Sequence, residues 1–225
     1  MEYTEILEKL KSLRDPRAVA AMAGYGINAD NAFGISIPHL RKIAKEIGKD
    51  HALSGQLWSS GIHEARIVAS MIADPRMVTE QELERWVSGF DSWDVCDQCC
   101  NNLFCRTDFA YQKAMEWSRR REECVKRAGF VLMACLAVHD KGADDIQFWQ
   151  FFPIIGSEAS DERNFVKKAV NWALRQIGKR NRSMNVEAIR AATGLKQIDS
   201  KSARWIACDA LRELKSDKIQ KRLVN

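Results

Sequence analysis

The chain has 225 residues, of which 46% are hydrophobic and 29% charged, and its formal net charge is +5 at pH 7. No run of about 18 apolar residues occurs, so the composition excludes a membrane-spanning helix. The length allows a substantial core within one large domain or a short array of repeats. We expect a single domain over residues 1–225.

The N-terminal segment MEYTEILEKLKSLRD is charged and amphipathic, unlike a signal peptide with an apolar centre. The chain has seven cysteines, an odd number, and no export signal, which is simplest to explain by reduced thiols. We therefore expect a cytoplasmic protein.

The positive charge is concentrated in the second half of the chain. Residues 1–110 carry 12 Lys+Arg against 16 Asp+Glu, whereas residues 111–225 carry 23 against 14. The first half is thus acidic by −4 and the second basic by +9. A basic half indicates a polyanionic partner, most commonly nucleic acid, although a solvated helical surface has the same composition.

Helical periodicity extends over almost the whole chain, and no segment alternates apolar and polar residues as a strand would. Four segments resemble one another, and each places a basic residue before an apolar helical face: HEARIVASMIADP, CVKRAGFVLMACLAVHD, NFVKKAVNWALRQIGKRN and SKSARWIACDALREL. Their basic residues, Arg66, Arg127, Lys168 and Arg204, are 61, 41 and 36 positions apart. Spacings of about 40 with paired helices are typical of HEAT-type repeats. We expect an all-α, HEAT-like solenoid whose concave face these basic residues line.

The segment FDSWDVCDQ predicts a helix start with a functional pair on one face. Asp91 is the expected cap, with Asp94 at the third helical position and Phe90 packed on Val95. Trp93 and Asp97 are four residues apart and therefore share a helix face. A carboxylate beside an indole ring suits a positively charged reaction centre.

Four cysteines follow within the same helix and just after it: Cys96, Cys99, Cys100 and Cys105. A zinc site needs a second ligand pair from another segment, and none is visible in the sequence. Buried thiols that pack between repeats are the favoured interpretation. The histidines lack ligand spacing and are interpreted as structural or surface residues: His39, His51, His63 and His139.

The second half contains the candidate phosphate contacts. Arg127 begins an apolar helix, where it either pairs with a carboxylate, Asp97 being one candidate, or meets a phosphate. Lys168, Trp172 and Arg175 share a helix face, and interleaved cations and an indole fit a surface that follows a nucleic-acid backbone. Three further cations come directly after that helix: Lys179, Arg180 and Arg182. The remaining tryptophans are expected in the core: Trp58, Trp86, Trp117, Trp149 and Trp205.

Three segments in this order, FDSWDVCD, VKRAGFVLMACLAVHD and DERNFVKKAVNWALRQIGKRN, resemble the AlkD-like family of DNA alkylation-repair glycosylases. The segment AFGISIPHLRKIAKEIG resembles the opening repeat of that family. The resemblance implies a domain of HEAT-like repeats that binds duplex DNA in a basic cleft. It also implies excision of cationic alkylated purines (3-methyladenine, 7-methylguanine or bulkier N3/N7 adducts), which leaves an abasic site. No metal or nucleotide cofactor is implied.

The resemblance also implies roles for five residues that match the family in type. Trp93 and Trp172 would be walls around the deoxyribose of the lesion, and Asp97 would be the catalytic carboxylate. Arg127 and Arg175 would hold phosphates beside the lesion. We expect a monomer in a bacterial or archaeal cytosol or nucleoid, acting on double-stranded DNA with alkylated bases.

Two other functions fit parts of the same pattern. One is a catalytically silent relative that binds bent or branched DNA, although such a protein has no need of a carboxylate at Asp97. The other is a HEAT-type scaffold for protein partners, whose concave face would be apolar or of mixed charge rather than basic.

Overall fold

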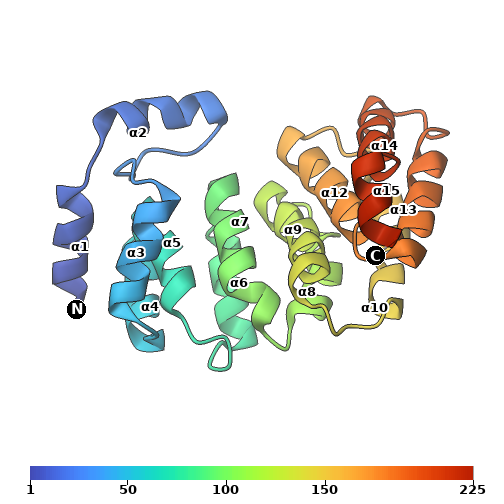
Figure 1. Cartoon of the computed structure of the whole chain (residues 1–225). Coiled ribbons are helices and arrows are strands. Elements are labelled where there is room, and N and C mark those ends of the chain that lie inside the picture. Colours follow the sequence, from blue (N-terminus) through green and yellow to red (C-terminus); the bar gives the residue numbers. More distant parts are fainter. Residues whose placement is uncertain (225) are drawn as a thin grey trace. The chain divides into compact units, whose positions relative to one another are not determined.

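A computed structural model describes residues 1–224, and every regular element in that range is a helix (Figure 1). The all-α prediction is confirmed. No helix in the described range combines the length and the apolar character needed to cross a membrane. The chain divides into two compact units, the first ending at Asp108 and the second beginning at Phe109.

In the first unit, alternate helices pack side by side. Helix α5 contacts both α3 and α7, and α4 packs against α5. Helix α2 runs crosswise to α1 and α3 (Figure 1). The helices, in chain order, are α1 (Tyr3–Ser12), α2 (Pro16–Met22), η1 (Ala23–Tyr25), α3 (Ile37–Ile47), α4 (His51–Ser59), α5 (His63–Ile72), α6 (Glu80–Ser88), α7 (Trp93–Asn102) and η2 (Phe104–Arg106).

A cluster of aromatic rings joins α4, α6 and the chain around α7. Trp58 stacks on Trp86 with a centroid separation of 4.3 Å. Phe90 meets the edge of Trp58 at 5.9 Å, and Phe104 lies 6.1 Å from both Trp86 and Phe90. Trp58 and Trp86 are therefore core residues, as predicted. Phe90, expected to pack on Val95, is a member of this cluster.

Buried charges in the first turn of α5 hold the chain segments that precede its two neighbouring helices. The Glu64 carboxylate is 1% exposed and accepts backbone N–H groups from residues 33–35, at 2.9, 2.6 and 3.2 Å, just before α3. The Arg66 guanidinium is 5% exposed and donates to Asp91 at 2.9 Å and to the carbonyl of Gly89, just before α7. One helical turn therefore fixes the entry of both adjacent helices.

The second unit repeats the alternation of packed helices. Helix α12 contacts α9 and α14, while α8 packs on α9 and α13 on α14. The α8–α9 approach requires Gly129, because a Cβ there would come within 2.3 Å of the Ser118 backbone nitrogen. The helices are α8 (Ala110–Trp117), α9 (Glu123–His139), α10 (Ile146–Trp149), α11 (Phe151–Glu158), α12 (Asn164–Ile177), α13 (Arg182–Leu195), α14 (Lys201–Leu214) and α15 (Asp217–Val224).

The start of α9 uses buried cations in the same way as the start of α5. Lys126 forms ion pairs with Glu158 and, at 3.6 Å, with Asp161, both of which precede α12. The Arg127 guanidinium is 6% exposed and donates to the carbonyl of Phe165 at 2.6 Å. A buried cation at the start of one helix thus binds the entry to the next.

This arrangement corrects the prediction that four repeated basic residues line an exposed face. Arg66 and Arg127 are buried and bound to their own unit, whereas Lys168 and Arg204 are exposed. A basic residue before an apolar helical face looks the same in sequence whether it binds the neighbouring backbone or faces solvent.

The tryptophan prediction needs a similar correction. Trp117 is buried, as are Trp58 and Trp86, but Trp149 and Trp205 are exposed. Trp205 is 42% exposed and lies under the Lys167 ammonium, 5.1 Å from its ring centroid. An indole at an apolar helical position was therefore not a sufficient sign of burial.

Replacing Glu64 by alanine should lower the free energy of unfolding by about 3–5 kcal/mol, because it leaves three backbone donors unsatisfied in a poorly hydrated site. Urea denaturation followed by circular dichroism measures the change. Glu8→Ala, which removes an exposed carboxylate from α1, is the control and should change stability by no more than about 0.5 kcal/mol. Equal effects of the two substitutions would contradict this account of Glu64.

Candidate functional site

The candidate pair Trp93 and Asp97 lies in the first five residues of α7. The helix begins at Trp93 with Ser92 as its N-cap, so the prediction of Asp91 as cap is wrong. Asp91 instead pairs with Arg66. The four-residue spacing of Trp93 and Asp97 survives this shift, because both lie inside the helix whichever residue caps it.

Asp94 holds the start of α7 against α5. Its carboxylate accepts the Ser92 hydroxyl at 2.6 Å and the Val95 backbone N–H at 2.9 Å, and its second oxygen lies 2.9 Å from His63 Nε2. Burial acts to raise the pKa of Asp94, but the hydrogen bonds and charge of His63, with the Ser92 and Val95 bonds, outweigh it and lower the pKa. Asp94 is therefore a structural carboxylate, and His63 is structural as expected.

The Trp93 indole is fixed by a hydrogen bond at its edge. Its Nε1–H donates to the backbone carbonyl of Tyr25 at 3.0 Å. Tyr25 ends η1 between two glycines, and Gly26 has φ of +69°, in the left-handed region that glycine adopts readily. The Tyr25 side chain is 72% exposed. The sequence does not reveal this contact, because the Gly-Tyr-Gly run marks a turn but does not identify its partner.

The two faces of α7 differ sharply. One face buries Cys96, Cys99 and Cys100, and the other carries half-buried polar side chains, including Asp97. Burial raises the pKa of the Cys99 thiol well above its usual range, so this thiol stays neutral. Cys105 is also buried. Within residues 1–224, no three His, Cys, Asp or Glu side chains are grouped to bind a metal. These thiols form the packed side of the helix that presents Asp97.

The second unit places the other candidate residues along α12. Lys168 is exposed and Trp172 is half-buried on the same helix. Arg175 forms an ion pair with Glu213 at 2.9 Å and approaches Asp209 at 3.4 Å. A phosphate bound by Arg175 would therefore replace carboxylate contacts rather than meet an unpaired guanidinium.

The cations that follow α12 have different surroundings. Lys179 pairs with Glu213 at 2.8 Å. Arg180 donates to the carbonyls of Ala137, Asp140 and Ala143 at 2.7–3.1 Å, and its guanidinium lies over the ring of Phe148, 3.8 Å from the centroid. Arg180 thus holds the end of α9, and its predicted contact with DNA stays a prediction.

Arg182, at the start of α13, is exposed and forms no ion pair among residues 1–224. With Lys168, it is a predicted DNA-binding cation that remains available to solvent.

A comparison with known protein families assigns the chain to one of them. The sequence profile of the DNA alkylation repair enzyme family matches residues 6–214. The chain belongs to this family. The resemblance inferred from FDSWDVCD and the two later segments is confirmed, and the match spans both compact units. None of the curated proteins compared with the chain matches it.

A comparison with solved structures identifies the fold. One, described as "a new family of proteins related to the HEAT-like repeat DNA glycosylases with affinity for branched DNA structures", superposes with a TM-score of 0.82. It is 18% identical, and the match covers 99% of this chain and 96% of that chain. At this identity the likeness concerns the fold, and it confirms the HEAT-like repeat prediction.

Two engineered proteins match less well. A designed armadillo repeat protein in complex with peptide (KR)4 is 13% identical over 82% of this chain and 88% of its own, with a TM-score of 0.38. An engineered protein is 15% identical over 93% of this chain and 98% of its own, with a TM-score of 0.39.

The lowered pKa of Asp94 predicts a loss of stability in acid. A carboxylate with a depressed folded-state pKa stabilises the fold above its ordinary pKa of about 3.9, and this contribution disappears as the pH falls through the folded-state value. Asp94→Asn should therefore be less stable than wild type at pH 6, and the difference should narrow below about pH 4. Urea titrations from pH 6 to pH 2 test this, and a difference that widens in acid would contradict it.

Proposed function

We propose that the protein is a monofunctional DNA glycosylase that hydrolyses the N-glycosidic bond of cationic alkylated purines in duplex DNA and leaves an abasic site. The substrates would be 3-methyladenine, 7-methylguanine or bulkier N3/N7 adducts. The observation that carries the proposal is a half-buried Asp97 carboxylate one helical turn from an indole that is itself held in place, in a member of the DNA alkylation repair enzyme family.

The chemistry of the substrate explains why so small a set of residues suffices. A purine alkylated at N3 or N7 is a cation, and when its glycosidic bond breaks the bonding electron pair leaves with the base, which departs neutral. Little general-acid assistance is needed. Positive charge develops on the sugar instead, as in glycoside hydrolysis. The protein must therefore stabilise an oxocarbenium-like centre and admit a water molecule to attack it.

Asp97 suits this task. A carboxylate about 4 Å from the developing charge contributes on the order of 4 kcal/mol at an effective dielectric of about 20. That stabilisation corresponds to roughly a thousandfold in rate. The same carboxylate can accept a hydrogen bond from the attacking water and take its proton. Asp94 cannot share this role, because its oxygens are committed to His63, Ser92 and Val95.

We assign the two tryptophans as walls of the sugar site. An indole face attracts a cation by about 0.5–2 kcal/mol. The bond from Trp93 Nε1 to the Tyr25 carbonyl restricts the ring in the free protein, so less side-chain freedom is lost when substrate binds. Trp172 is half-buried on α12 beside the exposed Lys168, in keeping with the second wall.

The DNA-binding part of the proposal rests on the second unit. Residues 111–225 carry the net charge of +9. Lys168 and Arg182 are exposed, and Arg175 and Lys179 lie in an ion-pair network with Glu213. We assign Lys168 and Arg182 as direct phosphate contacts, and Arg175 and Lys179 as contacts that exchange Glu213 for phosphate. Arg127, bound to Phe165, would act by positioning the start of α12.

A second function is favoured by one comparison. The structural neighbour at a TM-score of 0.82 belongs to a family described as having affinity for branched DNA structures. Binding of branched DNA without catalysis is therefore the alternative for this chain. It assigns no role to the carboxylate of Asp97, so the two proposals differ in what this residue does.

Asp97→Asn should reduce base release about a thousandfold while leaving DNA affinity nearly unchanged, because the amide keeps the shape of the side chain but loses its charge. The assay is release of free 3-methyladenine and 7-methylguanine from methylated duplex DNA. Asp108→Asn removes the same charge from an exposed position and should retain full activity. No release by wild type, with tight binding to a four-way junction, would favour the branched-DNA alternative.

The exposed cations should contribute to DNA binding, whereas Arg180 should contribute to the stability of the fold. Lys168→Ala and Arg182→Ala should each weaken duplex binding and lower the slope of log K against log salt by about one, with unchanged stability. Arg180→Ala should instead reduce stability, because three carbonyls lose their donor. Fluorescence anisotropy at several salt concentrations and thermal denaturation separate the two effects. An unchanged slope in both exposed-cation variants would remove them from the interface.

A further inference from the structure

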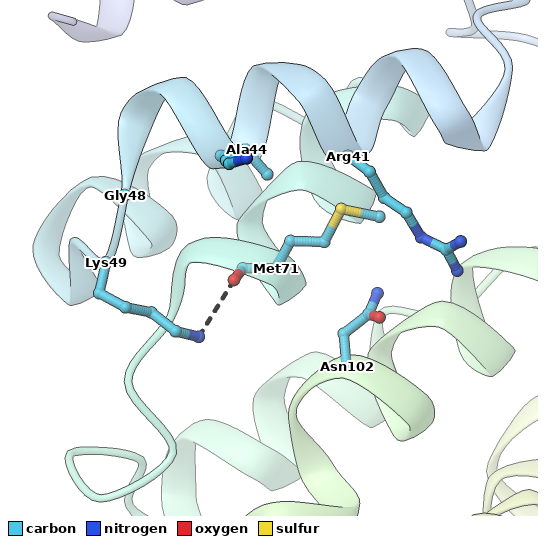
Figure 2. A pocket seen from close by; sticks show the side chains of 7 residues that line it. Arg41, Ala44, Gly48, Lys49, Met71 and Asn102 are labelled. Atoms are coloured by element: carbon cyan, nitrogen blue, oxygen red, sulfur yellow. Dashed lines mark hydrogen bonds between the residues drawn. The ribbon is translucent and has the colours of Figure 1, made fainter.

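A basic hollow lies within the first unit, on the side of α3 that faces the C-terminal ends of α5 and α7. Its volume is about 380 Å³. Arg41 and Lys45 border it from α3, Lys49 from the turn after α3, Met71 from α5 and Asn102 from α7. Figure 2 shows the Arg41 side chain reaching from α3 toward α7, with Met71 between Arg41 and Lys49.

The cations of this hollow have no carboxylate partners. Arg41 and Lys45 are exposed, and neither forms an ion pair with any of residues 1–224. Glu46, on the same helix, is occupied by Lys9 of α1.

Lys49 is held at the edge of the hollow. Its ammonium donates to the carbonyls of Met71 and Ala73 at 3.1 and 2.7 Å, which uses two of its three donors and caps the end of α5. Burial, followed by the positive charge of Arg106, lowers the pKa of Lys49, while Asp74 acts in the opposite direction. The Asp74 carboxylate is itself bound to Arg76 at 2.7 Å. Arg106 is therefore a further positive charge that acts on Lys49.

This cluster stands out because the surrounding half of the chain is acidic. Residues 1–110 carry a net charge of −4, yet Arg41, Lys45 and Lys49 border one hollow, and neither Arg41 nor Lys45 forms an ion pair within residues 1–224. Gathering like charges opposes folding unless a counter-charge binds. Arginine and lysine around an open hollow are the groups that bind phosphate oxygens, arginine through its planar fork and lysine as a point charge.

We propose that the hollow bordered by Arg41 and Lys45 is a phosphate-binding subsite that holds the DNA backbone to the first unit. This inference rests on the proposed function. Helix α7 contributes Asn102 to the hollow and also carries Asp97, so the subsite and the candidate carboxylate both belong to the first unit.

The test is duplex binding by Arg41→Ala, Lys45→Ala and the double variant, measured by fluorescence anisotropy with a 20-base-pair DNA at several salt concentrations. Each single substitution should weaken binding about two- to tenfold, and the double variant should lower the salt slope by about two. Both residues are exposed, and circular dichroism should report an unaltered fold.

Lys42→Ala is the matched control. Lys42 is exposed on the same helix and carries the same charge, but it does not border the hollow. A double variant that binds and responds to salt as Lys42→Ala does would overturn the subsite. The glycosylase proposal fails separately, if wild type binds the duplex but releases no alkylated base; the effect of Arg41 and Lys45 on binding can still be measured in that case.

Discussion

Each unit depends on buried charged groups that bind the chain at the entry to a neighbouring helix of the layer. Glu64 and Arg66 do this for α3 and α7, and Lys126 and Arg127 do it for α12. Burying a charge is costly unless it is paired and hydrogen-bonded, so these contacts fix where each helix begins more strictly than apolar packing can. Two helices that pack through apolar faces can shift along their axes at little cost. Three N–H groups that bind one carboxylate do not allow such a shift.

This constraint also explains why the candidate residues Trp93 and Asp97 lie at the start of a helix. Arg66 binds Gly89 and Asp91, and His63 binds Asp94, so both sides of the entry to α7 are anchored to α5. Asp97 and Trp93 follow within the next turn. Because the backbone at this point is anchored, the positions of Trp93 and Asp97 are well fixed. The buried thiols on the opposite face of α7 pack the helix against the core. The network around Asp94 and the role proposed for Asp97 are thus distinct but coupled.

Apolar periodicity was enough to predict the helices and their repetition, and the spacing of Trp93 and Asp97 placed them on one face despite the wrong cap. Sequence could not separate Arg66 and Arg127 from exposed cations, because each binds a backbone carbonyl 23 or 38 residues away. The hydrogen bond from Trp93 to the Tyr25 carbonyl could not be predicted for the same reason, because every residue type has a backbone carbonyl. The prediction that Trp149 and Trp205 are buried was wrong, because helix spacing does not reveal which helix faces lack a packing neighbour.

The segment that orients Trp93 is anchored unlike the rest of its unit. Neither α2 nor η1 has a buried residue, and the Trp93 contact is made to a main-chain oxygen between two glycines. A stretch with so little apolar contact opens at a free-energy cost far below that of unfolding the core. Hydrogen exchange would thus be fast for the amides of α2 and slow for those of α5. The contact that holds the Trp93 indole can therefore open with the α2–η1 segment, while α7, which carries both Trp93 and Asp97, stays in place.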